Sequence, residues 1–284
     1  MMVKKVVIPA AGLGTRLLPV TKEMPKEMLP IFVKNEKGET FLKPILQVIF
    51  EDLYDFGFRE FCFVVGRGKR AIEDHFTSDH GFVEFLRKRG KDGLTEGLEQ
   101  FYKKLDSSTV IFVNQPQPRG FGDAIYKARS FTGMESFLVH AGDDLIASDN
   151  NDHLKRLLDA HKKYNGHVTF LVEEVKDPTK YGVIVGDEVD KGIYKVKEVI
   201  EKPSKPPSNL AIIAIYLFKP IIYNAIQNIK PDENLELQLT DAIQNLAMQN
   251  SNIFAVKLGK DEKRLDIGTT DAYKSILQEA PRDI

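Results

Sequence analysis

Short, continuous apolar runs alternate with amphipathic stretches over the first half of the chain. The apolar runs have the length of single strands and predict strands at 3–9, 61–65, 110–113 and 137–140. The stretches between them carry apolar residues at helical spacing and predict helices at 44–56, 71–76, 81–105 and 123–129. This alternation is typical of a parallel sheet that is buried on both faces.

The pattern changes at about residue 168, where strands follow one another with fewer helices between them. Further strands are predicted at 168–173, 183–186, 194–201, 210–218 and 254–258. Helices are predicted at 235–249 and 270–278. The sheet is therefore expected to become mixed. The proline-rich loop at 203–207 is too short to separate domains, so 1–284 is expected to form a single domain.

Composition narrows the class of protein. The 284 residues include 40 Lys and Arg against 41 Asp and Glu, a formal net charge of −1. This balance argues against nucleic acid or an anionic membrane as a partner. The longest apolar run, 210–218, is far shorter than the roughly 20 residues that cross a bilayer. The lone Cys62 fits a buried strand, and a reduced, cytoplasmic location is expected.

A glycine-rich turn follows the first predicted strand. Gly12 and Gly14 would let backbone N–H groups approach a phosphate without an intervening Cβ. The dinucleotide fingerprint is excluded because Leu17 stands where its third glycine is needed, and no Gly-Lys-Ser/Thr triplet of a P-loop occurs. An anion-binding loop and a plain structural turn both remain open. Prolines at 19, 25 and 30 predict that the following segment is an ordered, extended loop carrying Arg16 and Lys26.

Two aspartates lie in glycine-containing turns far apart in the sequence. Asp143 follows the predicted strand 137–140, and Asp266 precedes Gly268. Carboxylates from separate segments can together hold Mg²⁺, which prefers oxygen ligands. Asp144 is a competing candidate, and a helix N-cap or turn aspartate is the alternative reading for each.

The run from Pro9 to Pro30 closely resembles the signature of the bacterial-type UTP–glucose-1-phosphate uridylyltransferase family (UDP-glucose pyrophosphorylases). Further similarities follow in the family's order, at 115–122, 142–144, 180–183, 201–203, 207–212, 236–243 and 266–268. The resemblance implies a Rossmann-like α/β/α sandwich with a mixed, mostly parallel central sheet. It also implies a nucleotide-binding half at 1–145 and a sugar-binding half at 146–284. The implied reaction converts UTP and α-D-glucose 1-phosphate into UDP-glucose and pyrophosphate, with Mg²⁺, in a homodimer or homotetramer.

The resemblance also implies a role for individual residues. Lys26 would hold the α-phosphate, and Lys202 would hold the phosphate of glucose 1-phosphate. Arg16 would hold the β- and γ-phosphates together with the amides of Gly12, Gly14 and Thr15. The nucleotide base would meet Gln115, Ala10, Ala11 and Gly120, with the Gln115 amide both donating and accepting. The sugar would meet Gly182, Glu201 and Asn209. Asp143 and Asp266 would be the metal pair.

The chain departs from the family pattern at two places. Asp123 follows Gly120-Phe121-Gly122 where many relatives have His, and Ala214-Ile215-Tyr216 stands where many have Gly-Arg-Tyr. Use of dTTP or of another sugar phosphate therefore remains an alternative. A non-catalytic nucleotide-sugar-binding homologue would be expected to lack a metal carboxylate or the loop cation, and all of them are present here.

Overall fold

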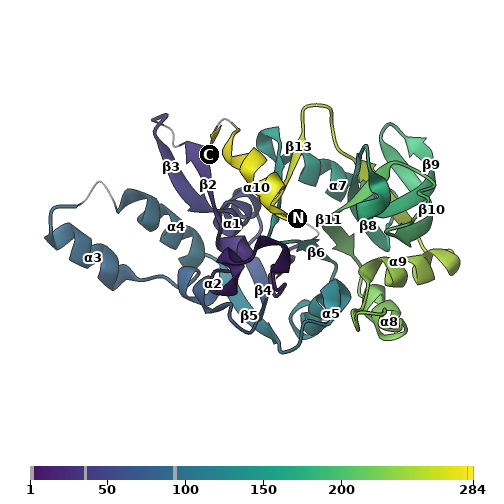
Figure 1. Cartoon of the computed structure of the whole chain (residues 1–284), viewed down its shortest axis with the longest axis horizontal. Helices are drawn as coiled ribbons and strands as arrows, with labels where there is room; N and C mark the ends of the chain where they lie inside the picture. Colours follow the sequence, from purple (N-terminus) through teal and green to yellow (C-terminus); the bar gives the residue numbers. More distant parts are fainter. Residues whose placement is uncertain (1–2, 35–36, 92–94, 280, 284) are drawn as a thin grey trace.

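A nine-stranded mixed sheet forms the centre of the molecule (Figure 1). The computed structural model describes residues 3–34, 37–91, 95–279 and 281–283. In spatial order the strands are β5 (Thr109–Gln115), β4 (Glu60–Gly66), β1 (Lys5–Pro9), β6 (Phe137–His140), β11 (Leu210–Phe218), β8 (Val168–Glu174), β12 (Ile253–Lys257), β10 (Ile193–Glu201) and β9 (Gly182–Asp190). The expected mixed sheet is thereby confirmed.

Parallel pairing is concentrated in the first half of the chain. Within this sheet the neighbours β5–β4, β4–β1, β1–β6 and β8–β12 are parallel. The other four neighbouring pairs are antiparallel. The share of parallel strand pairs is thus smaller than expected for a mostly parallel sheet. One reason is that only two residues join β9 to β10, and such a short connection makes a hairpin, whereas a parallel pair needs a long crossover.

Helices cover both faces of the sheet, as an α/β/α sandwich requires. Val6 and Ile8 of β1 pack into one apolar cluster with α1, α4 and α7, while Val7 faces the opposite cluster with α5, α8 and α9. The helices are α1 (Ile45–Phe56), α2 (Arg70–His75), α3 (His80–Lys88), α4 (Glu96–Asp106), α5 (Gly120–Lys127), α6 (Arg129–Thr132), α7 (Asp152–Lys163), α8 (Ile221–Gln227), α9 (Leu239–Met248) and α10 (Thr270–Leu277).

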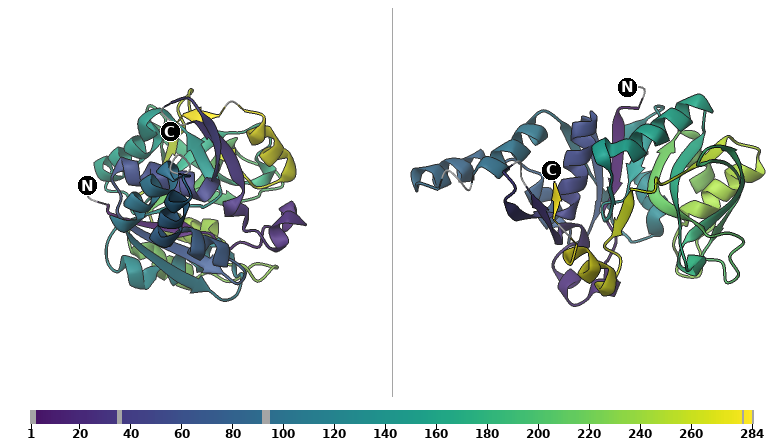
Figure 2. Two further views of the ribbon diagram at one scale, coloured as in Figure 1. Left: turned by 90° about the vertical axis from the view of Figure 1, so that its left-hand side faces the viewer. Right: turned by 90° about the horizontal axis from the view of Figure 1, so that it is seen from above.

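Several elements differ from the sequence predictions. The single helix expected at 81–105 is two helices, α3 and α4. The first helix ends because Gly90, just after α3, takes a left-handed conformation with φ of 68°. Residues 92–94 of the expected helix lie outside the described residues. Figure 2 shows α3 at the far end of an arm, beyond α4. The helix predicted from 235 begins at Leu239, and α7 and α8 were not predicted.

Two small sheets, also not predicted, lie beside the main one. They pair β7 (Asp144–Ala147) with β13 (Lys263–Asp266), and β2 (Pro30–Lys34) with β3 (Thr40–Pro44) and β14 (Arg282–Asp283). Short 3₁₀ turns complete the chain, at Thr15–Leu17 (η1), Val20–Lys22 (η2), Lys26–Met28 (η3), Asp149–Asn151 (η5) and Pro178–Lys180 (η6).

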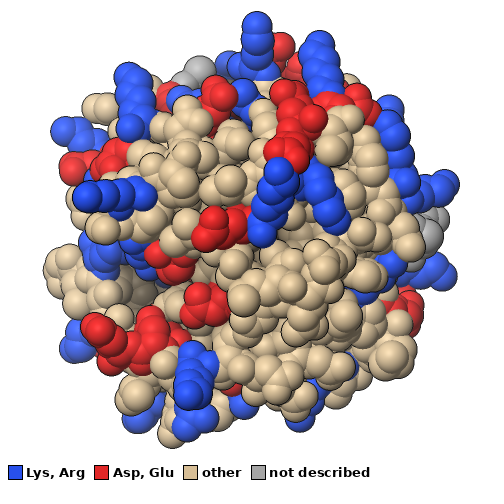
Figure 3. Space-filling view, turned by 90° about the vertical axis from the view of Figure 1, so that its right-hand side faces the viewer, with Lys and Arg blue, Asp and Glu red and all other residues tan. Residues whose placement is uncertain are grey.

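The surface carries both signs of charge. On the face that contains β9 and β10, acidic and basic side chains are interspersed (Figure 3). Among the described residues, no helix combines the length and the apolar character that crossing a membrane would require.

A buried ion pair fixes the segment that leads from β1 to β2. The expected extended loop is a series of 3₁₀ turns, and Pro19 and Pro25 stand directly before η2 and η3. Within η3, Glu27 accepts a 2.8 Å hydrogen bond from Lys69, which precedes α2. The two side chains are only 1% and 8% exposed, so neither charge has access to bulk water. This pair therefore anchors η3, and with it Lys26, to the end of β4.

Replacing Lys69 with Met should strongly destabilise the fold. The substitution leaves the Glu27 carboxylate buried without its partner, which typically costs about 3–5 kcal/mol. Urea unfolding followed by circular dichroism measures the loss. The double variant Glu27→Gln/Lys69→Met should recover a substantial part of it, because no uncompensated charge remains.

Lys88→Met is the matched control for Lys69→Met. Lys88 pairs with Glu84 on α3, but both side chains are largely exposed, so the loss should stay below about 1 kcal/mol. Equal losses in the two single variants would contradict the anchoring role of the Glu27–Lys69 pair.

Candidate active site

The carboxyl ends of the parallel strands bring the predicted nucleotide residues to one edge of the sheet. Ala10 donates to the Val64 carbonyl at 2.8 Å, and Gly142 donates to the Pro9 carbonyl at 3.2 Å. Gly66 ends β4 between the neighbouring segments, where a Cβ would lie 3.2 Å from the Ala11 carbonyl oxygen. Ligands of open α/β sheets bind at this edge, so the edge is the candidate active site.

The glycine-rich turn is held open by its own hydrogen bonds. Gly14 has a φ of 66°, a conformation that favours glycine, and its carbonyl accepts from the Thr21 hydroxyl at 2.7 Å. Gly12 and Thr15 are exposed, and neither amide donates a hydrogen bond among those found in the turns and loops of the described residues. Arg16 is also exposed and forms no ion pair with another described residue. The turn therefore has free capacity for an anion.

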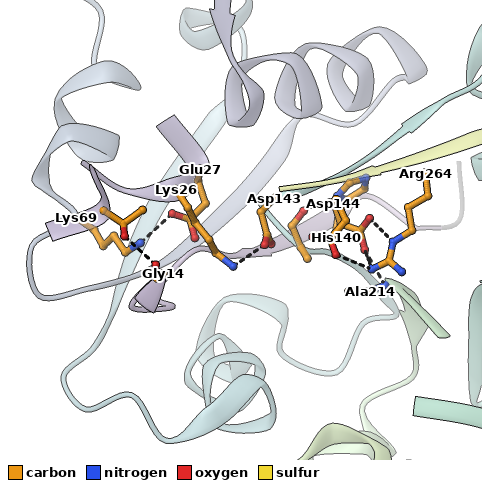
Figure 4. A network of polar contacts seen from close by, with 12 residues as sticks. Gly14, Lys26, Glu27, Lys69, His140, Asp143, Asp144, Ala214 and Arg264 are labelled. Carbon is orange, nitrogen blue, oxygen red and sulfur yellow. Dashed lines mark hydrogen bonds and ion pairs between the residues drawn. The ribbon is translucent and has the colours of Figure 1, made fainter. Parts of the chain in front are cut away.

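Lys26 and Asp143 meet beside this turn. The Lys26 Nζ lies 2.5 Å from the Asp143 Oδ2, and a Cβ on Gly12 would lie 3.9 Å from the same Nζ (Figure 4). Burial alone would lower the pKa of Lys26, but Asp143, Glu27 and Asp266 outweigh it and raise that pKa. Lys26 is thus a firmly protonated cation at the turn.

Asp144 is occupied by a different partner. Arg264 donates to both Asp144 oxygens, with Nε at 2.7 Å from Oδ1 and Nη2 at 2.8 Å from Oδ2. The Ala214 amide adds a third bond at 3.3 Å (Figure 4). Arg264 also donates to Glu173 at 3.0 Å. With its oxygens engaged in this way, Asp144 is less suited to a metal than Asp143.

The β7–β13 pairing places Asp266 near Asp143. Asp266 stands opposite Asp144 in this small antiparallel sheet, and the next residue, Ile267, donates to the Asp143 carbonyl at 3.1 Å. Burial first, then the negative charges of Asp144 and Asp143, raise the pKa of Asp266 to about 6 despite Arg264. The two aspartates, 123 positions apart in sequence, thus form one electronegative site.

This site fits a divalent cation. Burial is the main cause of the raised pKa of Asp266, and the negative charges of Asp144 and Asp143 add to it; a divalent ion would offset both effects. In the described part of the chain no three His, Cys, Asp or Glu residues converge as a metal cage. Two carboxylates, with water and phosphate oxygens completing the shell, are the donor set that Mg²⁺ commonly accepts.

Gln115 lies at the end of β5 and is almost fully buried. Its amide nitrogen donates to the Gly120 carbonyl at 3.1 Å and to Asp123 Oδ2 at 2.8 Å. Both amide hydrogens are therefore engaged. In this arrangement the oxygen is the atom of the amide that remains for a ligand, so acceptance from a ligand is available and donation would require one of these bonds to break.

The predicted sugar residues form a second group at the end of β10. Glu201 accepts from the Thr240 hydroxyl at 2.9 Å and pairs with Lys202 at 3.1 Å. A Cβ on Gly182 would lie 3.2 Å from the Glu201 Oε2. Asn209 is exposed, and its backbone carbonyl accepts from the Val175 amide; among the described residues, no hydrogen bond joins its side chain to Glu201.

Buried Tyr216 is influenced by the charge of Glu201 in this group and by that of Asp144 at the nucleotide edge. Burial raises its pKa, and the charges of Glu201 and Asp144 add to the shift, so both groups act on the same phenol.

The sequence assigned no role to four partner residues, although Asp123 was noted as a departure from the family pattern. Lys69, Asp123, Thr240 and Arg264 hold Glu27, Gln115, Glu201 and Asp144 respectively. Arg264 had a detectable signal, because residues two apart on a strand share a face, and Arg264 stands two before Asp266. Lys69 follows a second glycine-containing strand end, Gly66-Arg67-Gly68, which resembles the first.

Comparison with known proteins identifies the family of this chain. A family model described as Nucleotidyl transferase matches residues 5–282. A UTP–glucose-1-phosphate uridylyltransferase of Staphylococcus haemolyticus is 38% identical over 286 residues, covering 99% of this chain and 93% of that protein.

Solved structures show the same fold. A UDP-glucose pyrophosphorylase complexed with UDP-glucose has a TM-score of 0.84 and 34% identity, covering 98% of both chains. A UTP-bound enzyme from Acinetobacter baumannii has a TM-score of 0.83 and 27% identity, covering 98% of this chain and 93% of that one. By this match over almost its whole length, the chain belongs to the nucleotidyl transferase family.

Proposed function

We propose that this enzyme transfers a uridylyl group from UTP to α-D-glucose 1-phosphate, giving UDP-glucose and pyrophosphate. The observation that carries the proposal is the cluster of Lys26, Asp143 and Asp266 beside the Gly12–Gly14 turn. Relatives named for this reaction, with UTP- and UDP-glucose-bound structures among them, support the choice of substrates.

The reaction requires two anions to meet. A phosphate oxygen of the sugar attacks the α-phosphorus in line, a P–O bond forms, and the bond to the β-phosphate breaks to release pyrophosphate. Two like charges 4 Å apart repel by about 4 kcal/mol at an effective dielectric of 20, and several charges are involved here. Catalysis is therefore mainly neutralisation and positioning, and no covalent protein nucleophile is needed.

Lys26 is the central cation of this proposal. In the absence of substrate its ammonium is held by Asp143, which keeps it charged and aimed at the turn. We expect it to transfer its hydrogen bond to the α-phosphate as that group enters. Arg16 and the amides of Gly12, Gly14 and Thr15 would hold the β- and γ-phosphates. Lys202 would hold the phosphate of the sugar.

Asp143 and Asp266 would hold Mg²⁺, which when bound would neutralise negative charge on the phosphates. The base would lie against Ala10, Ala11 and Gly120, with Gln115 reading its edge. The sugar hydroxyls would meet Gly182, Glu201 and Asn209. In this proposal residues 1–145 form the nucleotide half of one domain and 146–284 the sugar half. A cytoplasmic location and a homodimer or homotetramer stay predictions.

A substrate matrix tests the reaction. The purified protein with Mg²⁺ should release pyrophosphate most rapidly with UTP and glucose 1-phosphate, among UTP, dTTP, CTP and ATP combined with several sugar phosphates. A faster rate with dTTP, or with another sugar phosphate, would replace the proposed substrate. No pyrophosphate in any combination would favour the non-catalytic homologue.

Lys26→Ala should lower kcat by about a hundredfold to a thousandfold, because a preorganised cation at the reacting phosphate is lost. Pyrophosphate release measures the effect, with circular dichroism confirming the fold. Lys22→Ala is the matched control, since Lys22 lies in the same segment with a side chain 76% exposed that pairs with its neighbour Glu23. A rate near wild type for the Lys26 variant would remove its proposed role.

Asp143→Asn and Asp266→Asn should each raise the Mg²⁺ concentration for half-maximal activity by about tenfold or more, because a charged ligand is lost. Magnesium titrations of the initial rate measure the shift. Asp271→Asn, an exposed carboxylate five positions after Asp266, should leave the titration unchanged. If Asp144→Asn shifts the titration while Asp143→Asn does not, Asp144 is the ligand.

A further inference from the structure

The orientation of the Gln115 side chain is decided by two acceptors. Its Nε2 lies 2.8 Å from Asp123 Oδ2 and 3.1 Å from the Gly120 carbonyl oxygen. If the amide were rotated by 180°, its oxygen would face both of these oxygens and neither hydrogen bond could form. The contact with the carboxylate is charge-assisted and the stronger of the two.

Asp123 is well placed to remain an acceptor. It lies in the first turn of α5, where the helix dipole favours a negative charge, and Lys127 stands 3.7 Å from its other oxygen. Its side chain is 8% exposed, so water does not compete for the bond with Gln115. An ionised carboxylate has no hydrogen to donate, and Gln115 can therefore meet it only through Nε2.

The arrangement leaves one polar atom of Gln115 for a ligand. Its Oε1 accepts no hydrogen bond from the part of the chain that the structure describes. This oxygen is also not one of the fully buried polar atoms that lack a partner. Gln115 stands opposite Gly66, whose lack of a Cβ lets the backbones of Ala11 and Gln115 approach closely at the nucleotide edge. The protein therefore offers a pure acceptor at this position.

We propose that Asp123 is a positioning residue that fixes Gln115 as an acceptor and thereby selects pyrimidines with a ring N–H over those with a ring acceptor. Uracil and thymine carry a hydrogen on N3, whereas N3 of cytosine is a lone pair that the Gln115 oxygen repels. This inference rests on the proposed function, in which Gln115 reads the base.

The departure from the family pattern at Asp123 thus has a physical consequence. The ionised carboxylate can only accept hydrogen bonds, whereas a side chain that can both donate and accept would allow the Gln115 amide to rotate. Asp123→Asn makes that change with almost no change in shape. In the variant, the introduced amide can accept from the Gln115 Nε2 as before or donate to its Oε1, and the second arrangement turns Nε2 toward the base.

The test is the ratio of kcat/KM for UTP to kcat/KM for CTP, with glucose 1-phosphate as the acceptor substrate. Asp123→Asn should lower this ratio by about tenfold, the scale of one neutral hydrogen bond. The UTP to dTTP ratio should stay within about twofold in the same variant, because both bases offer N3–H. Asp123→Ser should behave like Asp123→Asn, so whichever variant folds decides the question.

Lys127→Met is the control, because it removes the charge next to Asp123 while leaving the acceptor in place; its UTP to CTP ratio should match wild type. A merely structural role for Asp123 would lower kcat/KM for UTP and CTP in parallel, and an unchanged ratio would overturn the inference. These outcomes differ from failure of the proposed function, which would appear as a wild-type protein that does not use UTP.

Discussion

The ion pair between Lys26 and Asp143 is the interaction on which the site depends. It joins the segment after β1 to the segment after β6, and β13 adds Asp266 at the same place. A cation and an anion that hold each other in a partly buried site remain charged without a ligand. In the proposed function, phosphate would replace the carboxylate beside Lys26, and the metal would replace the ammonium beside Asp143. Each residue would thus exchange its partner for one of the same sign.

Neighbouring ion pairs keep this central pair specific. Lys26 lies between two carboxylates, Asp143 and Glu27, and both act on its pKa. Lys69 engages Glu27, so the Lys26 ammonium is left to Asp143. On the other side Arg264 engages Asp144. Figure 4 shows these three pairs side by side in a row along the sheet edge. The alternation of charge explains how closely spaced carboxylates can coexist in a buried edge.

Local sequence patterns were sufficient for some of these features and not for others. The apolar runs located β1, β4, β5 and β6, and strand ends in a parallel sheet converge, so the meeting of the Gly12 turn with Asp143 could be predicted. The choice of partner could not be predicted, because Asp143 and Asp144 are adjacent in the sequence. The β7–β13 pairing places Arg264 opposite Ile146, two residues from Asp144, and so brings Arg264 within reach of Asp144. The orientation of the Gln115 side-chain amide likewise depends on its hydrogen bond with Asp123, which a sequence motif cannot show.

Close backbone packing links the nucleotide and sugar groups. Gly122 donates to the Leu237 carbonyl at 3.0 Å, and Leu237 donates to the Arg119 carbonyl at 2.7 Å. A Cβ on Gly122 would lie 2.7 Å from the Leu237 oxygen, so only glycine permits this contact. The start of α5 is thereby attached to the segment just before α9. Asp123 of α5 contacts Gln115, and Thr240 of α9 contacts Glu201. The glycine at 122 permits this close contact, and in the proposed function the contact would help to fix the nucleotide residues relative to the sugar residues.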